Sequence, residues 1–239
     1  MMQMWEQDMV RFMEDASEYA DYHQQLADRL VPWLSPEMHI CDAGSGLGYL
    51  SLALAPCVKQ VTAVERHPRA AAVLEKKSRE KGIGNVISCC GAMEETIPAK
   101  PYDAMVFCFF GSVEEILSLA KAQCRGEVFV ITRNYTTHRF SVGQHASGSF
   151  GYQTFRETLA LQGIPVEEEL FALEFGQPFR SFADARRFYE MYSKDPNREV
   201  ITDEFLREKL IETGEETFPY YLSHRRNLAL LRFRVSDIP

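Results

Sequence analysis

The sequence lacks a long apolar run. No window of the 239 residues approaches the roughly 18 uninterrupted apolar residues that a membrane-spanning helix needs. The stretch from Met1 to Phe12 carries Glu6, Asp8 and Arg11 and has no basic start followed by an apolar segment, so it does not resemble a signal peptide. We therefore expect a soluble, cytoplasmic protein without a membrane partner.

Paired cysteines and an excess of basic charge are also missing. None of the six cysteines forms a C-x-x-C pair, and Cys41, Cys89, Cys90 and Cys108 lie in apolar runs. We interpret them as small buried side chains rather than metal ligands or redox pairs, and we expect no metal. The net charge of −8 disfavours nucleic acid as a partner, since a phosphate-binding groove needs a basic footprint. A local basic patch stays an alternative.

What the sequence does contain is an alternation of strands and helices. Apolar spacing predicts helices over 5–34, 49–55, 68–81, 113–124, 152–162, 181–192 and 202–214, the last two capped by Ser181 and Thr202. Apolar and alternating runs predict strands over 39–43, 61–65, 85–90, 102–110, 126–132, 166–175 and 227–235, with a polar loop from 134 to 151. This order indicates an α/β fold with a mostly parallel sheet and helices on both faces.

A glycine-rich turn follows the first predicted strand and precedes a helix. Asp42, Gly44, Gly46 and Gly48 stand in this turn, where glycine lets the backbone turn sharply and lets a ligand approach the main chain. The third glycine of the dinucleotide fingerprint is missing, because Tyr49 stands in its place. The Gly-Lys-Ser/Thr of a phosphate-binding P-loop is missing too. Both absences exclude the commonest nucleotide-binding interpretations of the turn.

From Ile40 to Thr132 the chain resembles class I (Rossmann-like) methyltransferases that use S-adenosylmethionine. Their first motif is an acidic residue followed by Gly-x-Gly-x-Gly at the end of the first strand, and Asp42 to Gly48 fits every position. The resemblance implies a doubly wound, mostly parallel seven-stranded sheet in which a terminal hairpin supplies one antiparallel strand. It also implies that the turn packs along the amino-acid part of the cofactor, through Asp42, Ala43, Gly44, Ser45, Gly46, Gly48 and Tyr49.

The next two strand ends carry further cofactor candidates. Glu65 ends the second strand about twenty residues after the turn, where a carboxylate can accept hydrogen bonds from both ribose hydroxyls. A solvated strand end is the alternative for Glu65, and Arg66 follows it. Relatives commonly carry an acid after the third strand, but Ala92 stands there. We expect the main chain of Ala92 and Met93 to hold the adenine, with Met93 on the ring or in the core and Glu94 as a substitute acid.

The end of the fourth strand departs from one branch of the family. Many amino-methylating relatives carry Asn/Asp-Pro-Pro-Tyr/Phe there, whereas this chain has Cys108-Phe109-Phe110-Gly111-Ser112. The departure argues against N-methylation of adenine or glutamine. We expect Phe109 beside the cofactor.

Candidates for the methyl acceptor are less specific. Because ligands lie at the carboxyl ends of the strands, the loop after the fifth strand offers His138 and His145 as possible bases, with Tyr135 beside them. Ordinary loop residues are an equal alternative. We name His138 and Tyr135 as candidate catalytic residues. Candidate acceptor-binding residues are Tyr19 and Tyr22, which also fit a core stripe, His145, and Arg180, which also fits a solvated connector. The cluster His224-Arg225-Arg226 is expected to be a solvated turn.

We divide the chain into an N-terminal helical lid (1–36), a cofactor-binding core (37–180), a helical insert (181–214) and the last strand of the core sheet (215–239). The insert is expected to shape the acceptor pocket or to form a homodimer contact. The leading hypothesis is a methyltransferase for a small molecule. The alternatives are a methyltransferase for RNA or protein, and a regulatory protein that binds S-adenosylmethionine without catalysis.

Overall fold

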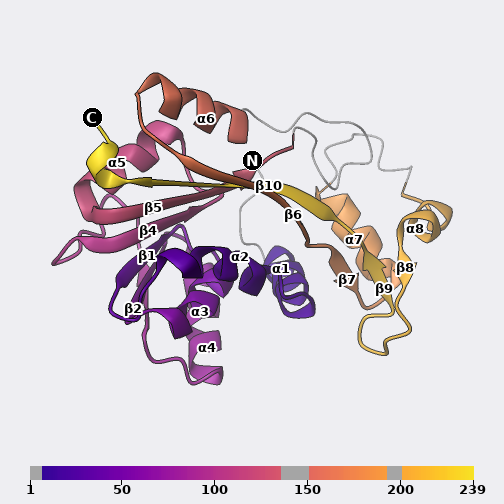
Figure 1. The fold of residues 1–239 in the computed structure, drawn as a ribbon. Coiled ribbons are helices and arrows are strands. Elements are labelled where there is room, and N and C mark those ends of the chain that lie inside the picture. The colour runs from indigo at the N-terminus through magenta and orange to yellow at the C-terminus, as the bar shows by residue number, and fades with distance from the viewer. Residues whose placement is uncertain (1–6, 136–150, 193–200) are drawn as a thin grey trace.

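The computed structural model describes residues 7–135, 151–192 and 201–239. Seven strands form the main sheet in the order β3-β2-β1-β4-β5-β10-β6 (Figure 1). Strand β10 runs antiparallel to both β5 and β6, while the other neighbours are parallel. The predicted α/β sheet is therefore confirmed. The strands are β1 (His39–Ala43), β2 (Gln60–Glu65), β3 (Val86–Cys90), β4 (Tyr102–Cys108), β5 (Cys124–Arg133), β6 (Glu167–Glu174) and β10 (Arg225–Arg234).

Helices cover both faces of this sheet. On one face lie α5 (Val113–Gln123) and α6 (Tyr152–Leu161), and on the other lie α2 (Tyr22–Leu30), α3 (Tyr49–Leu54) and α4 (Pro68–Glu80) (Figure 1). A large apolar core fills each side of the sheet. Strand β4 is buried from both sides, which explains why its sequence is a continuous apolar run rather than an alternating one.

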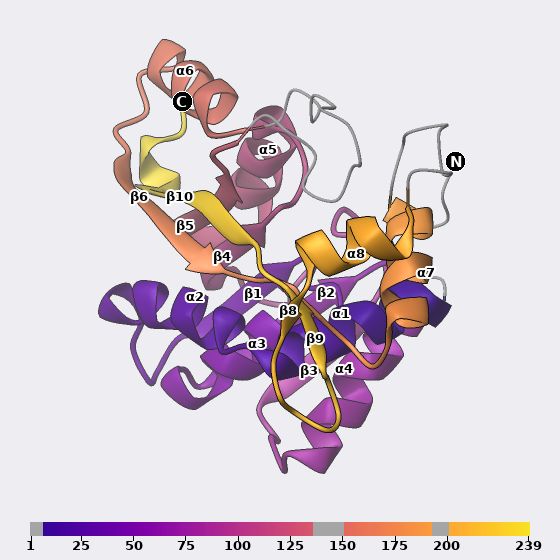
Figure 2. The same ribbon diagram turned by 90° about the vertical axis from the view of Figure 1, so that its right-hand side faces the viewer.

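A second, smaller sheet lies beside the carboxyl ends of the main strands. Its strands are β7 (Gln177–Phe179), β9 (Tyr220–Leu222) and β8 (Ile211–Glu212), all antiparallel. Helices α7 (Phe182–Tyr192) and α8 (Asp203–Lys209) pack with it, as Figure 2 shows. Ser181 and Thr202 cap these helices as predicted, since their hydroxyls accept from the N–H groups of Asp184 and Phe205.

The predicted helix over 5–34 is two helices, α1 (Gln7–Tyr19) and α2, and this part of the prediction is wrong. The apolar stripe runs across the break at three- and four-residue steps, so periodicity alone does not reveal it. The reason is tertiary: Phe12 of α1 belongs to the core of the small sheet, whereas Tyr22 and Leu26 of α2 belong to the core of the main sheet. Two helix axes are needed to reach two cores.

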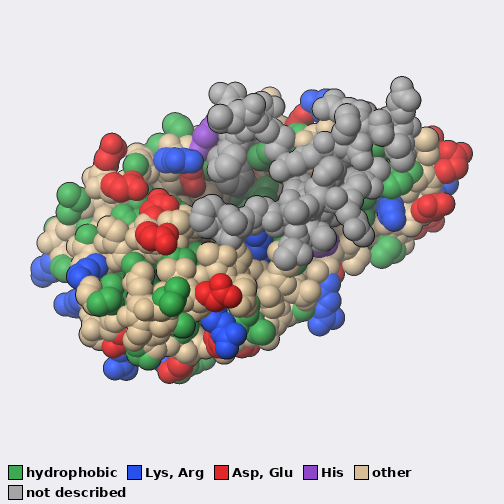
Figure 3. All heavy atoms as spheres, turned by 90° about the horizontal axis from the view of Figure 1, so that it is seen from above, with side chains coloured by type: hydrophobic (Ala, Val, Ile, Leu, Met, Phe, Trp, Pro, Cys, Tyr) green, Lys and Arg blue, Asp and Glu red, His purple; other side chains and the backbone are tan. Residues whose placement is uncertain are grey.

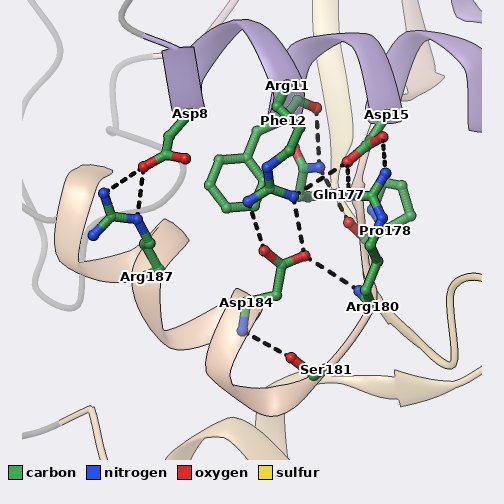
Figure 4. Close-up of polar contacts among 10 residues, drawn as sticks. All are labelled: Asp8, Arg11, Phe12, Asp15, Gln177, Pro178, Arg180, Ser181, Asp184 and Arg187. Atoms are coloured by element: carbon green, nitrogen blue, oxygen red, sulfur yellow. Dashed lines mark hydrogen bonds and ion pairs between the residues drawn. The ribbon is translucent and has the colours of Figure 1, made fainter.

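Arginine–carboxylate pairs fix α1 to the small sheet and α7. Arg11 Nη2 lies 2.6 Å from Asp184 Oδ1, and Arg180 Nη2 lies 2.6 Å from Asp15 Oδ1 (Figure 4). The main-chain oxygen of Phe12 accepts from the buried amide of Gln177 at 3.0 Å. Two-pronged guanidinium contacts are directional, so they set the orientation of α1 as well as its position.

Strand β7 was not predicted, because Pro178 lies within it. Proline cannot donate to a ladder and is confined to edge strands. The structure meets this condition, since β7 is an edge of the order β7-β9-β8. Gly176 precedes it at a close approach of two backbones: a Cβ at this position would overlap the Leu222 carbonyl oxygen and the Tyr221 ring of β9.

Strand β1 is tied to α3 through a buried carboxyl group. The Ser51 hydroxyl donates to Asp42 Oδ2 at 2.5 Å, and Asp42 is almost completely buried. Burial raises the pKa of Asp42 to about 6, although the Ser51 hydrogen bond opposes this shift. The folded protein thus binds a proton at Asp42 more tightly than the unfolded chain does.

The pKa of Asp42 gives a pH-dependent stability. Its contribution is fully present below about pH 4 and is lost as the pH rises through 6. The unfolding free energy of the wild type, measured relative to that of Asp42→Asn, should therefore fall by about 2–3 kcal/mol between pH 4 and pH 7. Urea unfolding across this range measures it. The control is Asp28→Asn, which removes an exposed carboxylate of α2 and should not show this dependence on pH. If the difference in unfolding free energy between the wild type and Asp42→Asn did not change with pH, the raised pKa of Asp42 would be contradicted.

A second prediction concerns the packing of Gly48 against α4. Gly48 has φ of 78°, and a Cβ there would lie 2.7 Å from Leu74 Cγ. Gly82 has φ of 64°, and a Cβ added there would have no atom within 4 Å. Gly82→Ala should lose about 1–2 kcal/mol from backbone strain alone. Gly48→Ala should lose about 2–4 kcal/mol because overpacking is added. Equal losses in urea unfolding would refute the packing argument.

Candidate active site

A cavity of about 510 Å³ opens at the carboxyl ends of β1, β2, β3 and β4. Its size falls within the range of about 300–1,000 Å³ that is typical of small-ligand sites. One half is formed by the glycine turn and the ends of β2 and β3, and the other by α1, α2 and the ends of β4, β6 and β10. Lining residues predicted from the sequence are Tyr22, Asp42, Gly44, Ser45, Gly46, Gly48, Tyr49, Glu65, Arg66, Ala92, Met93, Glu94 and Phe109.

The glycine turn is left-handed at three alternating positions. Gly44, Gly46 and Gly48 have φ of 68°, 57° and 78°, values that strain any residue with a side chain. The N–H of Ser45 donates to the Val64 carbonyl of β2 at 3.0 Å, which holds the turn against the neighbouring strand. The Ser45 hydroxyl is buried and has no hydrogen-bond partner among the described residues. The turn therefore presents a polar group that the described residues leave unsatisfied.

Glu65 is held rigidly at the end of β2. Its Oε2 accepts from the N–H of Gly46 at 3.0 Å, and its Oε1 accepts from the N–H of His67 at 2.8 Å. Only 8% of the residue is exposed. Because a carboxylate can accept about four hydrogen bonds, each oxygen keeps capacity for one more donor. The carboxylate is thus fixed in orientation and still able to receive two ligand hydroxyls.

The end of β3 contributes an apolar wall. Met93 is buried and belongs to the core cluster between the sheet and α5, while it also lines the cavity. Its carbonyl accepts from the Gln123 amide at 2.8 Å, which fixes the local backbone. Met93 is therefore a core residue that also lines the cavity, and its contact with the adenine ring stays a prediction. Glu94 lies at the exposed rim of the same wall.

Phe109 ends β4 in a strained conformation. It is the one non-glycine residue in the described ranges with positive φ, at 55°, and its side chain is 46% exposed. The conformation costs about 1–2 kcal/mol and stops β4 at Cys108, two residues before the predicted end. It is held by a 2.9 Å hydrogen bond from the Phe109 N–H to the Ile131 carbonyl. Strain of this kind concentrates at ligand sites.

The wall opposite the glycine turn is aromatic. Tyr22 packs on Phe175 with ring centroids 4.3 Å apart, and His23 stacks on Tyr49 at 5.5 Å. Arg226 reaches into this group, with its guanidinium 4.2 Å from the Phe175 centroid. Burial, with a further effect from the charge of Arg226, lowers the pKa of His23 to about 3. The imidazole is therefore neutral at physiological pH.

The other predicted catalytic and acceptor residues lie elsewhere. The Tyr19 hydroxyl donates to Glu215 at 3.2 Å and its ring packs on Tyr221, away from the cavity lining. Arg180 pairs with Asp15 rather than facing the cavity. Tyr135 contacts the ring of His224. His138 and His145 lie outside the described residues, and Ala43 is buried within β1 without lining the cavity.

Several lining residues were missed by the sequence interpretation. They are Met13, Ser17, His23, Leu47, Leu50, Val64, Gly91, Cys108, Phe110, Gly111, Glu115, Phe175 and Arg226. Arg226 is the most instructive of them. In β10 it alternates with exposed Arg225 and Asn227 and shares the buried face with Leu228. The period-two pattern 226-228-230 was therefore a usable signal that Arg226 faces inward.

The cavity fits S-adenosylmethionine. The fixed carboxylate of Glu65 can receive the ribose hydroxyls, and the left-handed turn lets a ligand approach its main chain. Ser17 Oγ, Ser45 Oγ and His23 Nδ1 are buried polar atoms without partners in the described part of the chain. Buried polar groups are otherwise almost always hydrogen-bonded, so these atoms suit a polar ligand.

Comparison with known proteins agrees with this fit. The family model of protein-L-isoaspartate (D-aspartate) O-methyltransferase matches residues 7–116, which is less than half of the chain. No curated protein is similar enough in sequence to match.

Solved structures of methyltransferases share the fold. A protein assigned as a methyltransferase from Bacillus halodurans has a TM-score of 0.59 at 14% identity, over 89% of this chain and 98% of that one. A protein assigned as an RNA methyltransferase from Pyrococcus horikoshii has a TM-score of 0.52 at 15% identity, over 90% and 83%. Geranyl diphosphate methyltransferase in complex with S-adenosylmethionine has a TM-score of 0.51 at 14% identity, over 88% and 85%.

These similarities show the fold but do not identify the methyl acceptor, because the sequence identity is low and the acceptors of these proteins differ. Among the described residues, no helix is long and apolar enough to span a membrane. Sheet order, glycine turn, cavity and family match agree on one conclusion. The chain has the fold of the class I methyltransferases, enzymes that use S-adenosylmethionine as methyl donor.

Proposed function

We propose that the chain transfers the methyl group of S-adenosylmethionine to a small-molecule acceptor bound in the cavity. The observation that carries the proposal is the aromatic wall of Tyr22, Phe109 and Phe175 opposite the glycine turn. Apolar and aromatic walls with a few polar groups are typical of small-ligand sites. The net charge of −8 further disfavours an RNA acceptor.

The charges on one face of the molecule agree with the same choice. Where Figure 3 is not grey, basic and acidic side chains are interspersed on the face seen from above, without a field of basic residues alone. A groove for a nucleic acid backbone would gather lysine and arginine instead.

The proposed roles in donor binding follow from the geometry. Glu65 accepts the ribose hydroxyls, the turn from Gly44 to Gly48 packs along the amino-acid part, and Met93 packs on the adenine. The bound cofactor supplies a methyl group on a positively charged sulfur. The chain contributes orientation of the acceptor, which can provide much of the rate acceleration. Burial raises the pKa of the Cys108 thiol, so this lining residue stays protonated and does not act as a nucleophile.

A base is required only for an acceptor that loses a proton. His138 and Tyr135 stay predictions for that role. Two alternatives also remain. The match to protein-L-isoaspartate (D-aspartate) O-methyltransferase favours a protein acceptor, and a regulatory protein would bind the cofactor without transfer.

Calorimetry with S-adenosylhomocysteine tests the donor site. Glu65→Gln replaces a carboxylate that receives two main-chain donors, so it should weaken binding by about 10- to 100-fold, the value of one charge-assisted hydrogen bond or somewhat more. Glu95→Gln is the matched control, since Glu95 is exposed nearby and does not line the cavity. Absence of binding by the wild type, with its fold intact by circular dichroism, would refute the proposed function.

The acceptor class is tested with a labelled methyl donor. The wild type is incubated with a small-molecule fraction, an RNA fraction and a protein fraction of a cell extract. Label should enter the small-molecule fraction, and Glu65→Gln should abolish it there. Label in RNA or protein alone would overturn the small-molecule proposal. Donor binding without transfer to any fraction would favour the regulatory alternative.

A further inference from the structure

A buried arginine faces the cavity without an acidic partner. Arg226 is 9% exposed, and no carboxylate among the described residues lies within ion-pair distance of its guanidinium. Its Nη1 contacts the Tyr22 hydroxyl at a long 3.4 Å, and its Nε has no partner in the described part of the chain. A guanidinium has five N–H donors, so most of its hydrogen-bonding capacity is unused.

Aromatic rings compensate only part of this charge. The guanidinium carbon lies 4.2 Å from the Phe175 centroid, 5.3 Å from that of Tyr22 and 5.9 Å from that of Phe109. Such contacts stabilise a cation but use none of its in-plane N–H donors. Buried charges are normally paired. The rings therefore hold the guanidinium plane in place and leave its donors available to a ligand.

Three of the four acids that line the cavity are engaged elsewhere. Asp42 accepts from Ser51, Glu65 accepts from Gly46 and His67, and Glu115 forms a capping box with Ser112. The fourth, Glu94, lies at the exposed rim after β3, and no ion pair joins it to Arg226. The loop sequence from 136 to 150 contains no acidic residue at all. The charge of Arg226 also contributes, after burial, to the lowered pKa of His23, as an uncompensated cation would. Within the ranges 7–135, 151–192 and 201–239, no carboxylate supplies the counter-charge for Arg226, and a ligand is the source that we consider.

We propose that Arg226, held among Phe175, Tyr22 and Phe109, is a clamp that binds a carboxylate group of a ligand in the cavity. This inference rests on the proposed function, because that function brings two sources of a carboxylate to the site: the methionine end of the donor and the acceptor itself. Guanidinium binds a carboxylate through two parallel hydrogen bonds, which fixes its orientation as well as its charge.

The sheet order favours the acceptor as the source. The turn after β1 and the ends of β2 and β3 form the donor half of the cavity, whereas Arg226 begins β10, on the other side of β4 and β5. The neighbouring Phe175 and Tyr22 offer flat apolar contacts. Their combination with one guanidinium is suited to a planar acid such as an aromatic carboxylate.

The test compares Arg226→Met with Arg225→Met. Both remove an arginine from the same strand, but Arg225 is exposed on the opposite face. Methionine keeps apolar contact with the rings, so the variant should fold, and urea unfolding checks this. Arg226→Lys keeps the charge without the two-pronged geometry. The probes are S-adenosylhomocysteine, 5′-methylthioadenosine, which lacks the carboxylate, and benzoate with its neutral analogue benzamide.

For an acceptor carboxylate, all variants bind both adenosine compounds as the wild type does. Benzoate then binds equally well to the S-adenosylhomocysteine complexes of the wild type and of Arg225→Met. It binds the corresponding complex of Arg226→Met about 10- to 100-fold more weakly. Arg226→Lys gives an intermediate loss, and benzamide does not distinguish the variants. If Arg226 binds the donor carboxylate instead, Arg226→Met weakens the binding of S-adenosylhomocysteine by the same factor. The binding of 5′-methylthioadenosine is then unaffected.

The proposed role of Arg226 would be refuted if the Arg226→Met variant folded and bound every probe as tightly as Arg225→Met does. This result differs from failure of the proposed function, in which the wild type binds neither adenosine compound.

Discussion

The hydrogen bond from the Gly46 N–H to the Glu65 carboxylate joins the turn after β1 to the end of β2. The donor half of the cavity depends on this contact, since it sets the carboxylate at a fixed position relative to the left-handed turn. Glycine adopts without strain the left-handed φ of 57° that Gly46 has in this turn. The His67 N–H completes the arrangement. Two main-chain donors thus stabilise a nearly buried charge and leave it two acceptor sites for a ligand.

The opposite wall depends on a second set of contacts, far from the turn in sequence. Helix α1 is oriented by Arg11 and Asp15, which pair with Asp184 and Arg180 beside the small sheet. This orientation places Met13 and Ser17 at the cavity while Phe12 enters the core of the small sheet. Because the pairs are two-pronged, they restrain rotation of α1 as well as translation. Arg180 therefore shapes the cavity indirectly, through the helix that lines it.

The two halves differ in how they balance charge. In the donor half, acids are satisfied by main-chain or hydroxyl donors: Glu65 by N–H groups and Asp42 by Ser51. In the other half, the cation Arg226 has aromatic neighbours and no acidic partner in the part of the chain that the structure describes. A protein can tolerate such a cation where a ligand supplies the missing charge. This asymmetry is the physical basis of our proposal that donor and acceptor bind at opposite ends of one cavity.

Local sequence was sufficient to predict most of the main sheet, and it also pointed to the glycine turn and Glu65, which line the cavity. The reason is that Asp42 to Gly48 and Glu65 act within short segments whose conformation depends on glycine and on strand ends. It was insufficient for strand β7, because Pro178 excludes central strands but not edges. It also missed the break between α1 and α2, since an apolar stripe does not say which core it faces.

The sequence by itself determined the α/β fold and the glycine turn, because these follow from residues adjacent in the chain. Only the tertiary structure decided which side chains form the aromatic wall of the cavity. Tyr22, Phe175 and Arg226 are separated by up to 204 residues and meet through the packing of α2 on β6 and β10. Arg226 is buried as a result of that packing, and no local sequence pattern indicates which groups surround its guanidinium.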